Sequence, residues 1–427
     1  MKLQHLFVVA CGAVASVNGE PTSPHDLALR MLASIQQRGQ AALDAGGSTG
    51  FIQLGLFWQA LAVVTQPAPF SAANDDLRPL LDESLASSVS AFSNITRDAN
   101  LPLDRLSLGA DMVAWSLASG NETAAQYLPT ISTLNASLAL QPRNANGGLW
   151  YYNNVNNLTA YRNLSYLDGM YSYAPFVTIL SQLDDSHEDP VRALEAALQQ
   201  IQILYDICVL PSGLLVHGYD ALKAHQWANS STGASPEVWG RSLAWFSLGI
   251  LNTLEVAART PDLECSEGYA TLKLLFQNVM LAQVRAAERS NALTGLPGVW
   301  QVVDRPGDVG NYVEASSSFM TVYTILRGAR LELLFDDKHG RTLHEHHINC
   351  TSSVISIATE IYKSVSAEYL IIYTNGSLSL NGTSIVASLS PQNVSYDYYV
   401  SRPTEMDSLI GTSAFALASF EMGMLDA

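Results

Sequence analysis

The segment Leu140–Leu180 reads LQPRNANGGLWYYNNVNNLTAYRNLSYLDGMYSYAPFVTIL. Its first part is rich in Asn and Gly, which favour loops, and from residue 168 onward it becomes an apolar run of helical length. A second long loop, 210–237, leads in the same way into an apolar helical run at 238–258. A long loop that opens into an apolar helix is therefore a recurring unit of this chain, and this unit decides the fold.

Helical periodicity predicts about twelve helices, which come in pairs separated by loops that hold Gly, Pro and Asn. Twelve antiparallel helices favour an all-α fold, an (α/α)6 barrel in which six hairpins form a ring and the long loops gather at one end, where a site would form. Two helical bundles are the alternative, but no linker marks a boundary between them. The predicted helices span residues 24–45, 50–66, 77–94, 104–119, 122–140, 168–184, 188–209, 238–258, 264–289, 314–334, 342–363 and 406–425.

One region has the pattern of strands. Residues 368–390, EYLIIYTNGSLSLNGTSIVASLS, alternate in polarity and contain Asn-Gly twice. Asn-Gly between alternating segments is typical of a tight turn, so we expect a small β-hairpin near the C-terminus.

The chain opens with MKLQHLFVVACGAVASVNGEP, in which one lysine precedes an apolar run and then small residues. This pattern is typical of a secretory signal peptide, which we expect over residues 1–19, with cleavage near Gly19 or, as the other candidate, near Ser16. The run is too short to span a bilayer, and no later segment predicts a membrane helix. We therefore expect a secreted, extracellular protein with a single domain over residues 20–427.

The formal net charge is −17, which argues against binding to nucleic acid or to an anionic membrane surface. An anionic substrate would therefore need a local cation. N-linked glycans are expected as well, because Asn-x-Ser/Thr acceptor sites are frequent. They begin at Asn94, Asn121, Asn135, Asn157, Asn163, Asn229, Asn349, Asn375, Asn381 and Asn393.

Cysteines and histidines carry no metal pattern. Cys208 lies in an apolar helical run and is expected to be a buried free thiol. Cys265 and Cys350 could form a disulfide, which the sequence leaves open. No Cys/His cluster has the spacing of zinc ligands, so we expect no metal site.

Chemistry-bearing residues fall in the loops or where a loop opens a helix. Asp104 and Asp168 each precede a predicted helix, and Arg241 follows another long loop. Carboxylates can transfer protons, and a guanidinium can hold a carboxylate bidentately. Five of the seven tryptophans lie in the same segments, and aromatic rings form platforms for sugar rings. The pattern indicates a carbohydrate site that takes an acidic sugar; these tryptophans are Trp150, Trp227, Trp239, Trp245 and Trp300.

Each of these residues also has a purely structural interpretation. The two aspartates could be plain N-caps, each stabilising its helix by about 1 kcal/mol. His217 could be a turn residue that hydrogen-bonds the backbone, and the tryptophans could pack between helices. Arg241 could form a structural ion pair with Glu237 or Asp220.

Seven segments taken together resemble a known family. The chain resembles the unsaturated rhamnogalacturonyl hydrolases, six-hairpin (α/α)6 glycosidases, and most closely their fungal secreted members, from about residue 30 to the C-terminus. The segments are LDRLSLG (103–109), GGLWYY (147–152), YLDGMYSYAPF (166–176), GLLVHGYD (213–220), WGRSLAW (239–245), GNYVEASSSFM (310–320) and DSLIGTSAFALASFEM (407–422).

The resemblance implies a substrate left by a pectin lyase, with a C4=C5 double bond in the uronic acid at its non-reducing end. It implies that Asp168 protonates C4, that water adds at C5, and that the aglycone, typically rhamnose, is then released. Asp104 is implied as the second pocket carboxylate, and no metal or cofactor is implied. The tyrosines around Asp168 would supply a desolvating wall. The resemblance also implies that His217, Arg241 and Trp245 contact the unsaturated sugar and that Trp239 shapes its pocket. We expect Trp150, Tyr151 and Tyr171 to bind substrate as well.

Two features depart from the family pattern. Tyr151 and Tyr152 stand where bacterial relatives often have His and a basic residue, which bears on the preference beyond the cleaved bond. Asn163, a glycan acceptor, lies only five residues before Asp168. Two alternatives therefore stay open: a conventional acid–base (α/α)6 glycoside hydrolase acting on a saturated glycan, and a non-catalytic sugar-binding protein on the same fold.

Overall fold

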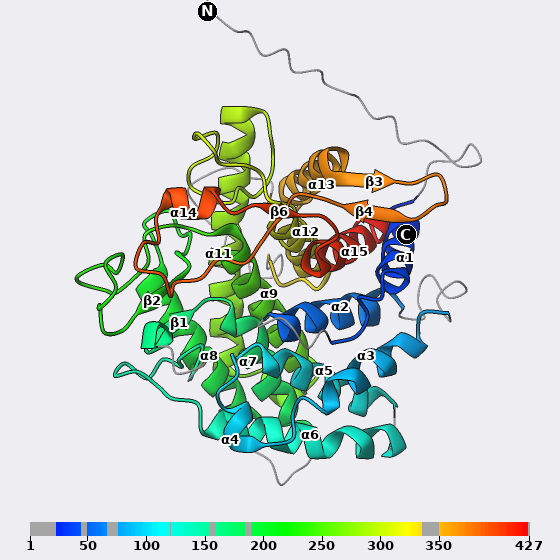
Figure 1. The fold of residues 1–427 in the computed structure, drawn as a ribbon, viewed down its shortest axis with the longest axis vertical. Helices are drawn as coiled ribbons and strands as arrows, with labels where there is room; N and C mark the ends of the chain where they lie inside the picture. Colours follow the sequence, from blue (N-terminus) through cyan, green and yellow to red (C-terminus); the bar gives the residue numbers. More distant parts are fainter. Residues whose placement is uncertain are drawn as a thin grey trace, which may run out of the picture.

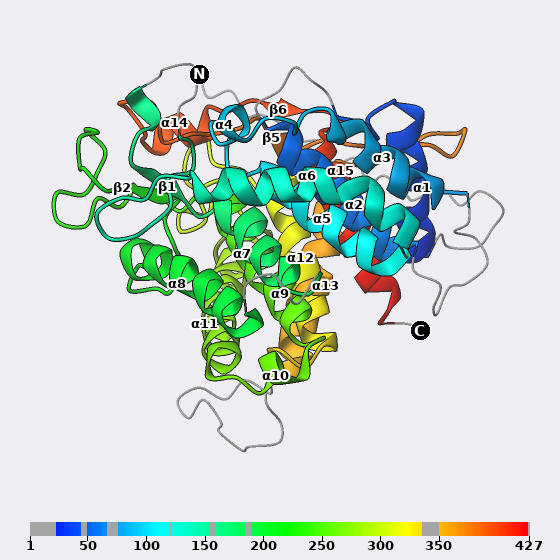
Figure 2. The same cartoon turned by 90° about the horizontal axis from the view of Figure 1, so that it is seen from below.

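Six helices form a closed inner ring, in which each helix packs against the next and the last packs against the first (Figures 1 and 2). The computed structural model describes residues 23–43, 49–65, 76–119, 121–153, 159–183, 189–334 and 350–425. The ring consists of α2 (Gly50–Val64), α5 (Arg105–Ser119), α7 (Gly169–Leu180), α9 (Gly240–Ala257), α12 (Ala315–Arg330) and α15 (Leu409–Gly423).

A second layer of helices surrounds this ring and pairs with it (Figure 2). Each outer helix packs on one or two inner ones, as α6 does on α5 and α8 does on α7. The outer helices are α1 (Pro24–Gln37), α3 (Pro79–Val89), α6 (Asn121–Ala139), α8 (Pro190–Cys208), α11 (Glu267–Thr294) and α13 (Cys350–Tyr369). The predicted (α/α)6 barrel of about twelve helices is thus confirmed.

The sequence missed the short elements and misplaced some helix ends. The predicted helix 24–45 ends at Gln37, because the chain turns at Gly39 with φ +70°. The predicted helix 77–94 is shorter, and Asn94 instead caps a separate helix, α4. The start predicted at 342 lies outside the described residues. The short helices are α4 (Ile95–Asp98), α10 (Pro261–Glu264), α14 (Tyr396–Val400) and the 3-10 helix η1 (Thr159–Tyr161).

Three short antiparallel sheets of two strands each occur in the described part of the chain. The predicted hairpin is confirmed in its first half, where β3 (Leu370–Ile372) pairs with β4 (Leu378–Leu380). The second half pairs elsewhere, since β5 (Thr383–Ser384) meets β6 (Thr404–Glu405). The third two-stranded sheet joins the two long loops named at the outset: β1 (Leu164–Tyr166) pairs with β2 (Gly218–Asp220).

The inner helices are apolar on nearly every side because each has ring neighbours on both flanks. In α15 every residue from Ile410 to Gly423 is buried, which is typical of a helix in the centre of a large core. Small residues permit the close approach of α7 and α9: a Cβ atom at Gly249 would collide with the backbone of Met170. No helix in the described residues is both long and apolar enough to cross a membrane.

Several expectations about processing fall outside the described residues or concern side chains at the surface. The expected signal peptide, residues 1–19, lies outside them. Cys208 is a buried free thiol, as predicted, and Cys265 is an exposed free thiol. Among the glycan acceptors of the described residues, the exposed ones are Asn94, Asn135, Asn229, Asn375 and Asn393.

Candidate functional site

The candidate site lies where the inner helices begin. The first residues of parallel helices meet at one end of a ring. The β1–β2 sheet lies at the same end, because β1 ends just before α7 begins. Asp104 immediately precedes α5, Asp168 precedes α7, and Trp239 precedes α9. The fold therefore brings together side chains that are far apart in the sequence.

Asp168 occupies the N-cap position of α7, but its side chain makes no capping hydrogen bond, so the capping interpretation is wrong for this residue. Its Oδ2 atom accepts a hydrogen bond from the Ser242 hydroxyl instead. The Nε2 atom of His217 lies 3.6 Å from the same oxygen. Asp168 as a whole is only 8% exposed. The carboxyl thus contacts α9 and does not cap its own helix.

Burial raises the pKa of Asp168 to about 6, although the Ser242 hydrogen bond and the nearby Arg241 charge both act to lower it. Desolvation disfavours the charged form of a carboxyl, and no cation among the described residues pairs with this one directly. Asp168 is therefore largely protonated below pH 6 and still able to give up its proton. A group with this property can act as a general acid and afterwards as a general base.

Asp104 is fully buried beside it. The Tyr151 hydroxyl donates a hydrogen bond to Oδ1, while Oδ2 has no hydrogen-bond partner among the described residues. Burial raises the pKa of Asp104 to about 7. The Tyr151 hydrogen bond acts to lower this pKa, and the negative charge of Asp168 acts to raise it. Two neighbouring carboxyls with raised pKa values are unusual for a structural core and common in active sites.

Aromatic rings enclose these carboxyls. The Tyr166 ring lies 4.7 Å from the ring of Tyr151 and 5.2 Å from that of His217, measured between centroids. Tyr166 thus belongs to the desolvating wall that the sequence predicts around Asp168. Tyr151, the departure from the family pattern, is one of its hydrogen-bonding members, since its hydroxyl binds Asp104.

His217 is neutral in this site. Burial lowers the pKa of its imidazole to about 3. Its Nδ1 atom lies 2.8 Å from the Tyr399 hydroxyl, and its ring centroid lies 4.6 Å from that of Trp239. Tyr399 comes from α14, a short helix that the sequence did not predict. His217 can therefore offer Asp168 a neutral hydrogen-bonding nitrogen but no positive charge.

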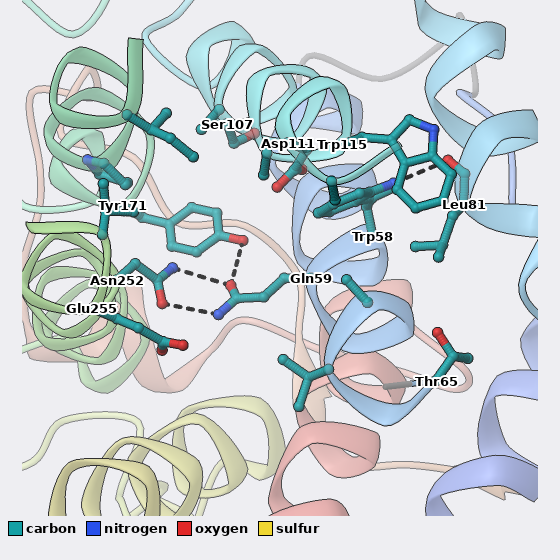
Figure 3. Close-up of a pocket in the computed structure, with 18 of the residues that line it drawn as sticks. Trp58, Gln59, Thr65, Leu81, Ser107, Asp111, Trp115, Tyr171, Asn252 and Glu255 are labelled. Carbon is teal, nitrogen blue, oxygen red and sulfur yellow. Dashed lines mark hydrogen bonds between the residues drawn. The ribbon is translucent and has the colours of Figure 1, made fainter. Parts of the chain in front are cut away.

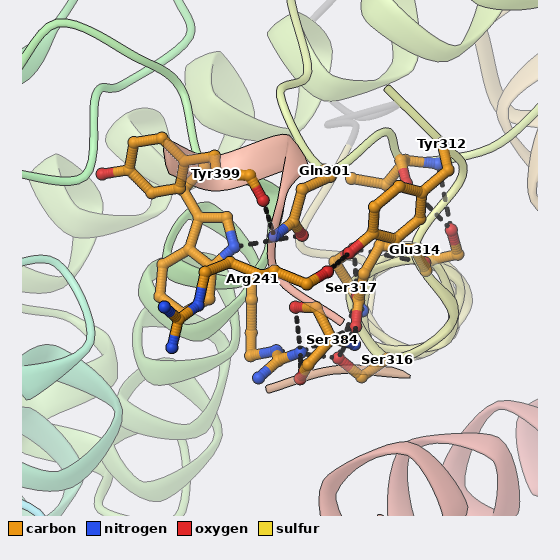
Figure 4. Close-up of polar contacts among 12 residues, drawn as sticks. Arg241, Gln301, Tyr312, Glu314, Ser316, Ser317, Ser384 and Tyr399 are labelled. Atoms are coloured by element: carbon orange, nitrogen blue, oxygen red, sulfur yellow. Dashed lines mark hydrogen bonds and ion pairs between the residues drawn. The ribbon is translucent and has the colours of Figure 1, made fainter. Parts of the chain in front are cut away.

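Arg241 forms a buried ion pair, as one sequence interpretation held, but with a different partner. Its Nη2 atom lies 2.8 Å from Oε1 of Glu314, which is the N-cap of α12 (Figure 4). The two partners expected from sequence are occupied elsewhere, because Asp220 binds His225 and Glu237 lies 3.4 Å from Arg305.

Serine hydroxyls complete the Arg241–Glu314 pair (Figure 4). Arg241 donates from Nε to Ser316 at 3.0 Å and from Nη2 to the Ser384 hydroxyl at 2.7 Å. Glu314 also accepts from the backbone N–H and the hydroxyl of Ser317, both at 2.7 Å. Burial would raise the pKa of Glu314, but the Arg241 charge and these hydrogen bonds outweigh it and lower the pKa. The guanidinium is therefore rigidly positioned, and its Nη1 atom makes no hydrogen bond to the described residues.

The remaining predicted residues either surround the Asp168 and Arg241 side chains or lie away from them. Trp239 is buried and donates its indole N–H to Gln301 at 3.2 Å, beneath the guanidinium of Arg241. Trp245 packs on Tyr171 with 4.5 Å between the centroids. The Tyr171 hydroxyl faces Gln59 in an interior cavity rather than the Asp168 carboxyl (Figure 3). Trp150 is half-buried in the loop that carries Tyr151.

Sequence reasoning missed four residues that shape the site. Ser242 and Glu314 lie inside motifs that carry the family resemblance, so their motif membership was a usable signal. Ser384 and Tyr399 come from the strand-like region and the segment after it, which offered no motif. Among the described residues, no group of three or more His, Cys, Asp or Glu side chains is arranged to hold a metal ion.

A family model described as Glycosyl Hydrolase Family 88 matches residues 72–426. The chain belongs to this family. As a family 88 protein it is a glycoside hydrolase, and the match spans all of the site residues named above. It is also similar to Protein Atu3128 of Agrobacterium fabrum, with 27% identity over 238 residues, which cover 54% of this chain and 91% of that protein.

Solved structures show the same fold. A family 105 glycoside hydrolase from C. acetobutylicum superposes with a TM-score of 0.72 and 24% identity, over 93% of this family 88 chain and 99% of its own. The unsaturated glucuronyl hydrolase from Bacillus sp. GL1 superposes with a TM-score of 0.58 and 12% identity, over 93% and 95% of the two chains. The six-hairpin ring is thus common to all three.

Proposed function

We propose that this protein is an extracellular unsaturated rhamnogalacturonyl hydrolase that hydrates the C4=C5 double bond of the uronic acid at the non-reducing end of pectin-lyase products. The observation that carries the proposal is Asp168, a buried carboxyl without a direct cation partner, whose pKa burial raises to about 6. Membership of family 88 and the likeness to an unsaturated glucuronyl hydrolase support the same substrate class.

The first step is proton transfer from Asp168 to C4 of the vinyl ether. Ser242 and His217 both face Oδ2, so Oδ1 is the oxygen left to carry the proton. The C4–H bond forms as the O–H bond breaks, and positive charge develops on C5 and the ring oxygen. The Asp168 carboxylate formed in this step lies beside that charge and stabilises it.

In the second step water adds to C5 and gives its proton to the same carboxylate, which restores the acid. The product at C5 is a hemiketal. Opening of this hemiketal breaks the ring bond between C5 and the ring oxygen, and the aglycone leaves from C1. One molecule of water is consumed, and the double bond is lost. A single residue thus serves as acid and then base, which requires a pKa near the working pH.

Ser242 can adapt to both states of Asp168. A serine hydroxyl has one hydrogen and can both donate and accept. The Ser242 oxygen contacts two acceptors, Oδ2 of Asp168 and, at 3.2 Å, the carbonyl oxygen of His217. The hydroxyl can donate to Asp168 when the carboxyl is ionised and to the His217 carbonyl when it is protonated.

Arg241 is the local cation that an anionic sugar needs in a protein of net charge −17. Glu314 and three serine or backbone partners fix its guanidinium before substrate arrives, so little side-chain entropy remains to be lost on binding. The uronate carboxylate would meet the remaining Nη1 side of this group. His217 and Trp239 would contact the same sugar.

The test is an assay of the purified protein on lyase-digested rhamnogalacturonan. Loss of the ultraviolet absorbance of the unsaturated uronyl group, with stoichiometric release of rhamnose, is the expected result. The matched control substrate is the same oligosaccharide after chemical reduction of its double bond, which should not react. Equal release from the reduced substrate would favour a conventional acid–base hydrolase, and no reaction with either would favour a sugar-binding protein.

We propose in addition that the protein is secreted and glycosylated. Support comes from the signal-peptide pattern and from exposed glycan acceptors such as Asn94 and Asn229. Expression in a eukaryotic secretory host should give a protein in the medium that starts near residue 20 and loses mass with an endoglycosidase. Retention inside the cell would contradict this expectation.

A further inference from the structure

A cavity of about 300 Å³ lies among the inner helices, and Asp168 is not part of its lining. Four inner helices, α2, α5, α7 and α9, supply most of the lining, which includes Ser107 and Tyr171 from the first turns of α5 and α7; Tyr323 of α12 and Leu81 of α3 complete it. Tyr171 follows Asp168 by three residues, about one helical turn, and its side chain belongs to the cavity. The site and this cavity therefore lie on successive turns of α7, and Asp104, Asp168, His217 and Arg241 do not line the cavity.

Aromatic rings form much of the cavity wall. Trp58, Trp115, Tyr171 and Tyr323 all line it. The two indoles meet edge to face with 6.4 Å between their centroids. Both indole N–H groups are already bound by α3: Trp58 donates to the Leu81 carbonyl at 3.0 Å, and Trp115 donates to the Asp82 carboxylate at 3.3 Å. The indoles thus offer the cavity only their apolar surfaces.

Amide groups give the wall oriented polar positions. Gln59 and Asn252 pair with each other at 2.9 and 3.2 Å, and the Tyr171 hydroxyl donates to Gln59 at 3.0 Å (Figure 3). Each primary amide has two N–H groups. The second N–H of Gln59 donates to the Tyr323 hydroxyl, so Asn252 is the side chain that keeps one N–H for another acceptor. This donor is held in place by the pairing itself.

Asp111 adds a carboxyl on the α5 side of the same space (Figure 3). Its buried Oδ2 atom has no hydrogen-bond partner among the described residues. Burial also raises the pKa of Asp111 well above its ordinary value, so this group enters the cavity as a neutral acid. A buried polar atom without a partner costs free energy, which a bound polar molecule would offset.

Charges occur only around the mouth. Arg78 and Arg259 are exposed there, and Glu255 is paired with Arg259 and Arg327. Two arginines at the entrance disfavour an organic cation. The interior holds no unpaired positive group among the described residues, which disfavours an anion.

We propose that this cavity binds the ring of a neutral monosaccharide. Flat aromatic walls suit the C–H faces of a sugar, and side-chain amides with a carboxyl suit its hydroxyl groups. The volume is at the lower end of the range for small-molecule sites, which excludes an oligosaccharide. This site is separate from the proposed hydrolysis and does not depend on it.

The test is calorimetric titration of the full-length protein with L-rhamnose, D-galactose and D-glucose. At least one should bind saturably in the millimolar range, with equal affinity in Asp168→Asn, which alters a side chain that does not line the cavity. Ala114→Phe fills the cavity from α5 and should weaken binding at least tenfold, with an unchanged melting temperature and unchanged hydrolysis. Asp111→Leu should weaken it about tenfold, whereas Asp111→Asn, which resembles the neutral acid, should stay within about threefold.

Three outcomes would overturn the proposal. The first is the absence of saturable binding by all three sugars. The second is binding that survives Ala114→Phe but disappears in Asp168→Asn, because the sugar would then occupy the hydrolytic site. The third is binding of tetramethylammonium in place of the sugars, with an affinity that rises tenfold per pH unit, because the cavity would then be a cation site.

Discussion

The two ends of the inner ring both bury carboxyl groups but treat them differently. At the end where the inner helices finish, Glu421 contacts Arg327 and Arg330, and Glu255 contacts Arg327 as well. Burial would raise the pKa of Glu255, but the Arg327 charge outweighs it and the pKa is lowered. Glu255 is therefore an ionised, structural carboxylate.

At the end where the helices begin, Asp104 and Asp168 have hydroxyl donors in place of arginines. Their pKa values rise to about 7 and about 6, with burial as the main cause in both. Glu314 is equally buried at this end, yet its pKa is lowered because Arg241 pairs with it. The comparison teaches that burial alone does not decide protonation in this protein. The presence or absence of a paired guanidinium does.

The comparison predicts opposite effects for neutralising a carboxyl of each kind, and the largest effect is on catalysis. Asp168→Asn removes the proposed acid and should lower kcat about 10³-fold, because a positioned acid–base group contributes 10² to 10⁴-fold. KM should change little. The readout is the rate of absorbance loss on lyase-digested rhamnogalacturonan, with Asp206→Asn, at an exposed carboxyl of α8, as the control.

The same variant has a stability signature. The folded pKa of Asp168 is raised, so its favourable contribution is full below its unfolded pKa near 4 and is lost as the pH rises through about 6. Asp168→Asn should therefore gain melting temperature relative to wild type at pH 8 and not at pH 4. A loss of stability at pH 8 would show that the ionised carboxyl is needed for the fold.

Glu421→Gln should instead destabilise the protein, by about 3 kcal/mol, because it removes the buried charged partner of Arg327, which is itself buried, and of the exposed Arg330. Urea unfolding at pH 7 measures the change. Specific activity of the folded fraction should be unchanged, since the pair lies at the other end of the ring. An effect within 0.5 kcal/mol would remove the contrast between the two ends.

Ser242→Ala should shift the alkaline limb of the rate profile. Wild-type kcat/KM should fall tenfold per pH unit above about pH 6 as Asp168 loses its proton. The Ser242 hydrogen bond lowers the pKa of Asp168, so its removal should raise the apparent pKa by about one unit. Ser242→Thr keeps the hydroxyl and should restore the wild-type profile. A profile that does not move in the alanine variant would assign the titration to another group.

Tyr151→Phe tests the smallest effect. It removes the donor to Oδ1 of Asp104 and should raise the pKa of Asp104 further, since this hydrogen bond lowers it. One hydrogen bond to a charged group contributes about 1.5 to 3 kcal/mol, and we expect the low end because Asp104 is partly protonated. kcat should fall about tenfold with the melting temperature within 2 to 3 °C, as calorimetry would report.

The sequence predicted what local periodicity and motifs encode. All twelve large helices follow from apolar spacing, and Asp168, Asp104 and His217 follow from motif positions. The partner of Arg241 could not be predicted, because Glu314 lies 73 residues away and only the packing of α12 beside α9 brings it near. Tyr399 was missed for the same reason: its segment has no periodic pattern, and the His217 ring is 182 residues distant.

Tyr171 shows a second limit of sequence reasoning. It shares the motif of Asp168 and follows it closely, which favours a shared site. One helical turn advances the chain by about 5.4 Å, however, and this carries the Tyr171 hydroxyl into the interior cavity. The shared motif therefore predicted the helix correctly but not the direction in which each of its side chains points.

The position of α15 between α12 and α2 has a consequence for biosynthesis. Residues 409–423 are made after every other inner helix, yet they fill the gap that closes the circle. Until the ribosome has released them, the apolar flanks of α2 and α12 stay uncovered, and at 5–20 residues per second this interval lasts on the order of tens of seconds. The nascent chain thus keeps apolar helix flanks uncovered until its last helix is made, and a premature stop before residue 409 should yield aggregate rather than a smaller enzyme.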